Sequence, residues 1–366
     1  MKIICSKENL LNGINIVQKA VSTKTTLPIL EGILLNVDNK FKLTGNDLEI
    51  GIECFVEADI RNTGSIVINS KMFGDIVRRL PDSEVLIEVN EDNLVIVECE
   101  NSHFEIKGIN PSGYPSLPEV DKENILCLTQ SDLKDMIRQT VFAVGSDENR
   151  PVLTGTLIEV KNNELVFVSI DGYRLALRKK LINSDLSDFS VIVPGKILNE
   201  ISKILQATDE EVFVYNSNNQ IVFDTQSWRI VSRLIEGKFL NYNSLLNKEF
   251  ETKVIINNKE FQSSLERASL ISMNDKNSPV KLFISNDKIV ITSNAELGNV
   301  REEVKCEIVG NNLEIGYNPT YLIDALKAID DDRSSIYFIT TNAPCTFRPV
   351  IENSDAFAYL VQAVRI

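Results

Sequence analysis

Histidine is nearly absent from this 366-residue chain, which contains only His103. A histidine-based catalytic triad or a multi-histidine metal site therefore has almost no raw material. The alternating pattern around His103 predicts a residue on a strand surface instead. No P-loop or GxSxG motif occurs, and the candidate acidic residues are scattered at Asp47, Asp171, Glu302 and Glu303. We expect no catalytic residue, no metal and no cofactor; the enzyme alternative relies on those carboxylates alone.

Cysteines are few and long apolar runs are missing. The six cysteines show neither CxxC nor metal-ligand spacing, at Cys5, Cys54, Cys99, Cys127, Cys306 and Cys345. We expect reduced, mostly buried thiols. No run approaches the roughly 18 apolar residues of a membrane helix, and Met1 to Ser6 leads directly into a strand pattern rather than a signal peptide. These features favour a cytoplasmic protein with no membrane partner.

Positive charge is also in short supply, because the formal net charge is −14. Affinity for nucleic acid normally comes from clustered lysine and arginine, so the composition of the whole chain argues against DNA binding. With 43% hydrophobic and 25% charged residues, it reads as globular and long enough for two or three domains.

What the chain does contain is an internal repeat. ILEGILLNV at 29–37 recurs as VLTGTLIEV at 152–160 and, more weakly, as PVKLFI at 279–284. The next predicted strand follows in each copy, and a second helix opens near residues 70, 195 and 319. We therefore predict three copies of one α/β unit, at 1–122, 123–248 and 249–366.

Each copy shows the same switch between helical and strand periodicity. Helices are predicted at 6–21, 70–80, 131–144, 195–206, 258–271 and 319–329. Ser6, Ser131 and Asn258 are plausible N-caps for the first helix of each copy. Short alternating segments broken by turn formers lie between the helices. The fold expected is α+β, with two helices packed on antiparallel sheet in each copy.

The basic residues concentrate on these helices, which hold twelve basic against eight acidic residues. Strands and loops therefore carry the acidity. From the count alone, ordinary solvated helix faces are the favoured explanation of so small an excess. A basic face requires all helices to point the same way.

Four segments in order resemble the bacterial DNA sliding clamps, the β subunits of DNA polymerase III. They are TLPIL at 26–30, LTGNDLEI at 43–50, DGYRLA at 171–176 and YLVQAVRI at 359–366. The resemblance covers the whole chain. It implies three tandem DNA-clamp units and a head-to-tail homodimer that closes as a pseudo-sixfold ring, with helices lining the hole and sheets outside.

Such a ring implies a processivity factor that encircles duplex DNA without sequence specificity. Topology holds it there, so a weak, salt-screened field from the helices suffices for sliding. The resemblance places Lys24 and the loop 147–150, with Arg150, near DNA. The charge argument adds the helix residues Arg78, Arg79, Arg138, Lys196 and Lys203.

The resemblance also implies a pocket between the second and third copies for short apolar peptides of the replicative polymerase, the clamp loader, repair polymerases and other clamp-binding proteins. The matching positions are Gly172, Tyr173, Arg174, Leu175, Leu240, Leu245, Asn318, Tyr321, Leu360, Val361, Ala363, Val364 and Arg365. Apolar walls supply burial, while Arg174, Asn318 and Arg365 are expected to fix peptide carbonyls. Leu240 and Ala363 replace prolines common in the family, and Leu175, Leu245 and Val361 are alternatively core residues.

Ring closure requires an exposed strand edge in the first copy to pair with one in the third. The candidates are Ser102 to Asn110 and the stretch from Glu296 to Glu307. The expected interface residues are Lys71, Arg78, Phe104, Ile106, Lys107, Leu270, Ile271, Glu302 and Glu303, with basic and acidic groups complementary across it. Nucleoid association in the cytoplasm follows from this role. The alternative is a monomeric repeat scaffold that binds peptides without encircling DNA.

Overall fold

The computed structural model of the chain describes residues 1–22, 25–122, 124–182, 186–217, 219–246, 249–270, 279–295, 298–350 and 356–365. These residues form two compact units. Unit 1 comprises Met1–Ser131 and Lys203–Leu234, and unit 2 comprises Asp132–Ser202 and Ile235–Ile366.

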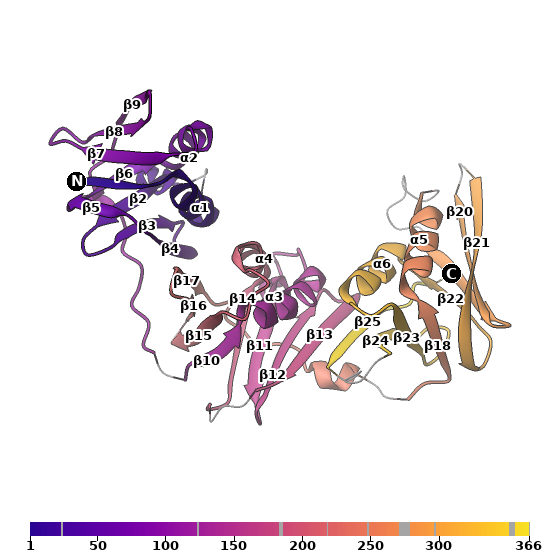
Figure 1. The fold of residues 1–366 in the computed structure, drawn as a ribbon. Coiled ribbons are helices and arrows are strands. Elements are labelled where there is room, and N and C mark those ends of the chain that lie inside the picture. Colours follow the sequence, from indigo (N-terminus) through magenta and orange to yellow (C-terminus); the bar gives the residue numbers. More distant parts are fainter. Residues whose placement is uncertain are drawn as a thin grey trace. The chain divides into compact units, whose positions relative to one another are not determined.

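Unit 1 contains two antiparallel sheets (Figure 1). The five-stranded sheet has the order β5 (Asp59–Asn62), β1 (Lys2–Ser6), β7 (Glu84–Val89), β8 (Leu94–Cys99), β9 (Ser102–Lys107). The eight-stranded sheet has the order β10 (Leu126–Thr129), β15 (Glu211–Ser217), β16 (Gln220–Asp224), β17 (Trp228–Arg233), β4 (Ile50–Val56), β3 (Phe41–Asn46), β2 (Gly32–Val37), β6 (Gly64–Asn69). Its helices are α1 (Lys7–Val17), α2 (Ser70–Arg79), η1 (Gln18–Ala20), η2 (Pro28–Glu31) and η3 (Pro111–Gly113).

Unit 2 contains one twelve-stranded arrangement, again antiparallel throughout. Its order is β14 (Phe189–Pro194), β11 (Gly155–Lys161), β12 (Glu164–Ile170), β13 (Arg174–Leu181), β25 (Phe357–Val361), β24 (Cys345–Pro349), β23 (Arg333–Phe338), β18 (Thr252–Asn257), β21 (Gly298–Gly310), β20 (Lys288–Ala295), β19 (Val280–Ser285), β22 (Leu313–Tyr317). Its helices are α3 (Gln130–Arg138) and α4 (Gly195–Ile204), which lie mainly in this unit, α5 (Asn258–Ser269), α6 (Pro319–Ala328), η4 (Val141–Ala143), η5 (Pro151–Thr154) and η6 (Tyr242–Leu245).

The predicted three-copy repeat is confirmed in the order of elements. Each copy begins with a strand and a helix, continues with a group of antiparallel strands and a second helix, and ends with three strands. The related hairpins β2–β3, β11–β12 and β19–β20 all pair in the same antiparallel way. Each copy is therefore two helices on antiparallel sheet, as the sequence predicted.

The two compact units do not coincide with the three copies. Strands β10 and β15–β17 of the second copy extend the sheet of the first, through pairing of β17 with β4. Strands β11–β14 join the third copy through pairing of β13 with β25. Sheet continuity across copies thus places the division inside the second copy, and the three residue ranges given above stay a prediction.

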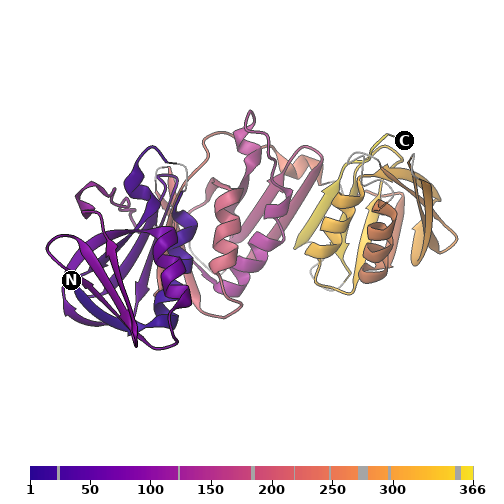
Figure 2. The same cartoon turned by 90° about the horizontal axis from the view of Figure 1, so that it is seen from above.

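The helices follow the predicted apolar periodicity. Leu10, Ile14 and Val17 are fully buried on α1, and Phe261, Leu265 and Ala268 are fully buried on α5. Helices α5 and α6 pack against each other and lie side by side over the strands of the third copy (Figure 2). The core therefore lies between these helix faces and the sheets.

Two of the three predicted N-caps are wrong by one or two residues. Ser6 does cap α1, since its hydroxyl accepts from the Asn9 amide at 3.1 Å. Helix α3 begins at Gln130, so Ser131 lies inside it. Helix α5 is capped by Asn257, whose side chain accepts from the Glu260 amide, rather than by Asn258.

Several sequence expectations concern isolated residues. His103 lies on the exposed surface of β9 and its Nδ1 is 2.9 Å from Glu98 Oε1. The cysteines are free; four are buried, Cys306 is half-buried and Cys127 is exposed. Among the described residues, no helix is long and apolar enough to cross a membrane, and no group of three acidic, histidine or cysteine side chains is placed to hold a metal ion.

Candidate functional site

A tight turn between β12 and β13 forms the first part of the predicted peptide pocket. Asp171 Oδ1 accepts from the amides of Tyr173 and Arg174 at 2.8 and 3.0 Å. Gly172 has a φ of 98°, a value that glycine adopts without steric cost. The Asp-Gly pair is thus a structural turn, as the sequence indicated, and Asp171 is committed to it.

Arg174, the first residue of β13, is held by several partners at once. Its Nε donates to Asp171 Oδ2 at 2.9 Å, and its Nη2 donates to the Phe142 carbonyl at 2.7 Å. Its Nη1 also donates to Asp324 of α6. The guanidinium lies 4.5 Å from the centre of the Tyr321 ring. This side chain joins the turn, η4 and α6 into one rigid corner.

Burial and charge act in opposite directions on Arg174, whose side chain is 12% exposed. Burial disfavours the cation, but the neighbouring Tyr359, Asp171 and Asp324 raise the pKa of the guanidinium above its usual value. The group is therefore charged at any physiological pH. Three of its donors serve partners within the chain. The expected role of Arg174 in fixing a peptide carbonyl stays a prediction.

The carboxyl-terminal segment lies directly beside this turn. Strand β25 pairs with β13 in the register Leu175 opposite Leu360. Beyond the strand, the Gln362 amide donates to the Tyr173 carbonyl at 2.8 Å, and the Val364 amide donates to the Gly316 carbonyl at 2.8 Å. Three segments that are distant in sequence are thereby brought together.

The predicted pocket residues divide into a buried floor and an exposed rim. Leu175 and Val361 are fully buried and Leu360 is 9% exposed. The alternative prediction, that Leu175 and Val361 are core residues, is therefore confirmed. Four apolar side chains are exposed, namely Tyr173, Leu240, Leu245 and Val364. Gly172 and Arg365 are also exposed, Tyr321 and Ala363 are half-buried, and the side chain of Asn318 accepts from the Thr320 amide as the N-cap of α6.

Two residues that contact Arg174 at the predicted pocket could not be identified from the sequence. Phe142 supplies a carbonyl and a ring 5.7 Å from Arg174, and Asp324 supplies its second carboxylate. The one signal for them was chemical: an arginine inside an apolar motif requires a carboxylate partner. The sequence could not identify which acidic residue that was.

The residues predicted to face DNA are exposed to different degrees, and most arginines among them are paired. Arg78 Nη1 donates to Asp75 at 2.9 Å, and Arg150 Nε donates to Asp147 at 2.9 Å. That bond is the main reason that the pKa of Asp147 is lowered. Such pairs reduce the positive field that these helices and this loop present.

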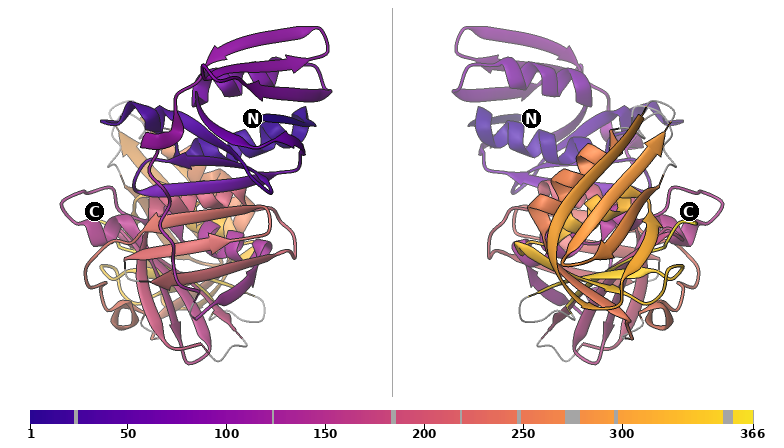
Figure 3. Two further views of the ribbon diagram at one scale, coloured as in Figure 1. Left: turned by 90° about the vertical axis from the view of Figure 1, so that its left-hand side faces the viewer. Right: turned by 90° about the vertical axis from the view of Figure 1, so that its right-hand side faces the viewer.

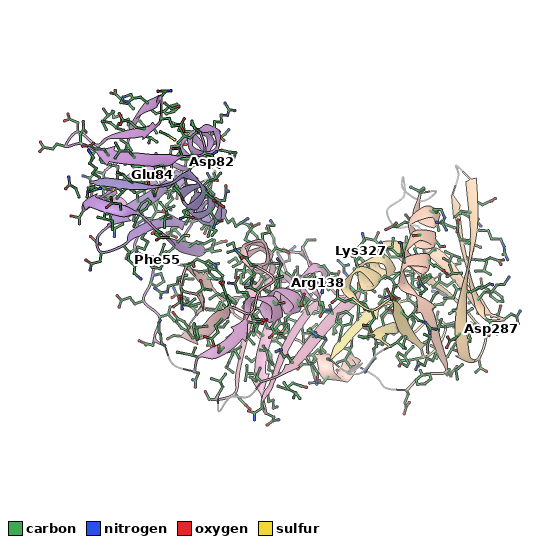
Figure 4. All side chains as sticks on the ribbon, in the orientation of Figure 1. Phe55, Asp82, Glu84, Arg138, Asp287 and Lys327 are labelled. Atoms are coloured by element: carbon green, nitrogen blue, oxygen red, sulfur yellow. The ribbon has the colours of Figure 1, made fainter. Side chains whose placement is uncertain are left out.

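Arg138, which Figure 4 labels on α3, is paired on both sides. Its Nη2 lies 2.6 Å from Asp330 and 3.2 Å from Asp135. Burial opposes its charge, but Asp330 and Asp135 raise its pKa. The remaining candidates Arg79, Lys196 and Lys203 are exposed, whereas Lys24 lies outside the described residues.

Strand β9 is the edge of its sheet, because it pairs with β8 alone among the described strands (Figure 1). Ile106 is buried, while Phe104 is 37% exposed and Lys107 is exposed. Lys71, on α2 of the same unit, is also exposed. The first candidate interface is thus an open strand edge with an exposed aromatic ring.

The long strand β21 offers a second open edge (Figure 3, right). Its residues 298–305 pair with β20, whereas residues 306–310 pair with β18 on the other side. Within the described ranges, no strand pairs along the other side of residues 298–305. A groove of about 450 Å³ follows this edge between β21 and α5.

The acidic residues of this edge have partners in their own chain. Glu302 accepts from Arg267 of α5 at 2.6 Å, and that bond lowers the pKa of Glu302. Glu303 pairs with Lys288 and Arg301, which lower its pKa as well. Leu270 is 58% exposed at the end of α5, and Ile271 lies outside the described residues.

Comparison with known proteins assigns the chain as a whole. Three family models for the DNA polymerase III beta subunit match in series: the N-terminal domain at residues 1–118, the central domain at 127–241 and the C-terminal domain at 243–364. The beta sliding clamps of Staphylococcus epidermidis and Staphylococcus aureus are 36% and 34% identical, covering 100% of this chain and 99% of each relative.

Solved structures agree with the sequence relatives. A putative DNA polymerase III beta subunit from Eubacterium rectale has a TM-score of 0.94 and 38% identity, with 100% of both chains covered. The sliding clamp of Bacillus subtilis has a TM-score of 0.94 and 35% identity, covering 100% of this chain and 99% of that one. The chain therefore belongs to the DNA polymerase III beta subunit family, the bacterial sliding clamps.

Proposed function

We propose that this chain closes with a second, identical chain into a ring around duplex DNA and tethers its polymerase through the pocket at Arg174. As a sliding clamp it is a processivity factor of replication and a non-catalytic subunit of DNA polymerase III. The observation that carries the proposal is the three-copy repeat, matched by the clamp family from one end of the chain to the other.

The two open strand edges support ring closure between two identical chains. An unpaired edge is an aggregation hazard unless another strand covers it. In a head-to-tail dimer, β9 of one chain pairs with residues 298–305 of the other chain, and the exposed Phe104 ring enters the groove beside α5. Because each chain carries both edges, the contact is heterologous, and we propose that it closes after two chains.

The charge distribution suits a ring that slides. The acidic partners of Arg78, Arg138 and Arg150 leave a weak positive field rather than tight phosphate sites. Topological enclosure makes strong attraction unnecessary, and screened contacts let the ring move along DNA. Arg79, Lys196 and Lys203 are the exposed cations proposed to supply the remaining attraction.

The pocket at Arg174 is proposed to take short apolar peptides of the replicative polymerase, the clamp loader and repair polymerases. Its exposed apolar rim and its buried floor at Leu175 and Leu360 provide what an anchoring side chain needs. The structure of a Pseudomonas aeruginosa relative is described as bound to griselimycin, and that relative is 28% identical to this chain. We propose that the exposed Arg365 contacts the peptide backbone.

A replication clamp works in the cytoplasm, and we further propose that this one is associated with the nucleoid through DNA. The experiment that tests the proposal follows the chain on DNA after loading by a clamp loader. Retention is expected on nicked circular plasmid and is expected to vanish when the plasmid is linearised. Equal retention on both forms would show binding by contact rather than by enclosure, and would contradict the ring.

A further inference from the structure

The turn of the peptide pocket has a close counterpart in unit 1, between β3 and β4. There, Asp47 Oδ1 accepts from the amides of Glu49 and Ile50 at 2.9 and 2.8 Å. The Asp47 amide donates to the Ile50 carbonyl at 3.1 Å, just as the Asp171 amide donates to the Arg174 carbonyl at 3.3 Å. The two turns are the same structure in consecutive copies.

The strand beside the turn is repeated too. β17 pairs with β4 and places Val231 opposite Gly51, as β25 places Leu360 opposite Leu175. At the end of β17, the Arg233 amide donates to the Glu49 carbonyl at 3.0 Å. This bond corresponds to the one from Gln362 to Tyr173. Two of the three backbone segments that build the pocket in unit 2, the turn and the strand beside it, therefore occur in the same arrangement in unit 1.

A cavity of about 230 Å³ lies at this place in unit 1. Its floor is apolar, with Ile50 and Val231 buried beneath it. The connector that ends the first copy forms another wall with Pro115, Leu117 and Pro118. The volume is below the roughly 300 Å³ at which drug-sized sites begin, so the cavity suits one or two side chains of a peptide.

The connector wall is fixed in place. Tyr114 donates its hydroxyl to the Thr44 carbonyl at 3.1 Å, and the Asn46 side chain donates to the Pro115 carbonyl at 3.2 Å. Leu117 packs against Gly51 so closely that a Cβ there would lie 2.1 Å from it. The cavity is therefore a built feature of the fold rather than a gap in a loose loop.

The mouth of this cavity carries a strained residue. Leu48 occupies the position of Gly172 and keeps a positive φ of 75°, which costs a leucine roughly 1 to 2 kcal/mol. Its side chain is 45% exposed and lines the cavity. Strain of this kind persists where the surrounding structure imposes it, and it often marks a functional site.

The rim differs from the pocket of unit 2 in its charges, since the exposed Glu49 takes the place of Tyr173 and also lines the cavity. Arg233 is exposed at the place that Gln362 takes in unit 2, and its guanidinium has no ion-pair or hydrogen-bond partner among the described residues. An unpaired arginine beside an apolar floor favours a ligand with a carboxylate next to an apolar side chain.

We propose that this cavity is a second peptide site, which takes a short extended segment of a partner protein that presents a leucine-like side chain beside an acidic residue. The apolar side chain enters over Ile50 and Val231, and the carboxylate pairs with Arg233. The choice of a peptide as the occupant rests on the function proposed for the pocket at Arg174, while the cavity, the strain and the unpaired charge do not.

The test uses the full-length chain and the probe peptide acetyl-Gly-Asp-Leu-Leu-Gly-amide. Methyl NMR signals of Ile50 and Val231 report on the unit 1 cavity, and those of Leu175 and Leu360 report on the pocket at Arg174. We expect saturable shifts at Ile50 and Val231, with affinity weakened about fivefold when asparagine replaces the aspartate of the probe.

Two charge-reversal variants complete the test. Arg233→Glu is expected to weaken binding at Ile50 and Val231 by at least about fivefold. Arg61→Glu is the matched control, since Arg61 is an exposed arginine of the same unit on β5, and it is expected to change nothing at these signals. Thermal unfolding of both variants confirms that each is folded.

The outcomes separate the two proposals. Absence of saturable shifts at Ile50 and Val231 at millimolar probe overturns the second site, as does equal affinity in Arg233→Glu. Shifts at Ile50 and Val231 with none at Leu175 and Leu360 support the second site and contradict the pocket proposed for unit 2. The strain at Leu48 has a separate check. Leu48→Gly is expected to unfold at a higher denaturant concentration than Leu48→Ala, because glycine adopts a positive φ without strain. A lower unfolding midpoint for Leu48→Gly would refute the strain.

Discussion

Replacing Arg174 by alanine removes the side chain that joins three elements of the pocket. The change leaves Asp171 Oδ2, the Asp324 carboxylate and the Phe142 carbonyl without the guanidinium donors they have in the native chain. Removing one partner of a buried ion pair costs about 3 to 5 kcal/mol. Arg174 is 12% exposed and Asp324 is 27% exposed, so solvent relieves part of the loss. We expect about 3 kcal/mol.

Calorimetry of the full-length protein measures this cost. A loss of about 3 kcal/mol lowers the midpoint of thermal unfolding of a unit of this size by about 6 to 12 °C. The effect is expected to be local, so amide exchange of Gln362 and Val364, which bond to the segments around Arg174, should accelerate. Peptide affinity should fall with it.

Lys179→Ala is the matched control, because Lys179 lies on the same strand and forms an ordinary half-exposed pair with Glu164 at 2.8 Å. That pair is worth at most about 1 kcal/mol. Arg174→Lys should fall between the two, since lysine keeps the charge and loses the forked geometry. If Arg174→Ala lowered the midpoint no further than Lys179→Ala, the positioning role would be refuted.

Two further predictions concern titratable groups at the surface and in the core. Hydrogen bonds with Glu98 and Glu105 raise the pKa of His103, so its contribution to stability is complete below the unfolded pKa and is lost as pH rises through the folded value. An NMR titration should give a pKa above the usual 6.5 of histidine, and Glu98→Gln should lower it; no change on that substitution would contradict the assignment. A thiol reagent should modify the exposed Cys127 first, whereas burial raises the pKa of Cys5 to about 12 and should protect it until unfolding. Equal rates for the two would refute this account of the core.

Much of the fold could be predicted because each copy repeats a strong amphipathic pattern. Local capping was harder to predict, since two adjacent asparagines could each cap α5. The amide and side chain of Asn258 bond to Asp332 and Asp331 instead, which leaves the cap to Asn257. Tertiary partners, not local preference, settled that boundary.

The end of α3 shows the same limit. The apolar periodicity predicted a helix to residue 144, but the regular helix ends at Arg138. Thr140 turns its hydroxyl back to the Met136 carbonyl at 2.7 Å, and Gln139 donates to the Ala328 carbonyl of α6 at 2.9 Å. A short 3-10 turn, Val141–Ala143, then continues the apolar face. The sequence pattern predicted the apolar face of this segment but not the residue at which the regular helix ends.

The candidate site was predicted by position, through resemblance, and its chemistry was not. The sequence could place Arg174 in the pocket, but it could not show that Asp324, 150 positions away, would take one of its donors. The floor and the rim likewise became distinct only in the fold, where Leu175 is buried and Tyr173 is 62% exposed.

The mass of the native particle in solution distinguishes a closed dimer from a monomer. If two chains close the ring, sedimentation equilibrium at micromolar concentration gives twice the chain mass of 41.1 kDa, because the open edges of β9 and β21 are proposed to pair between chains. A single species with the mass of one chain would contradict the closed dimer and would leave the monomeric peptide-binding scaffold as the account of this protein.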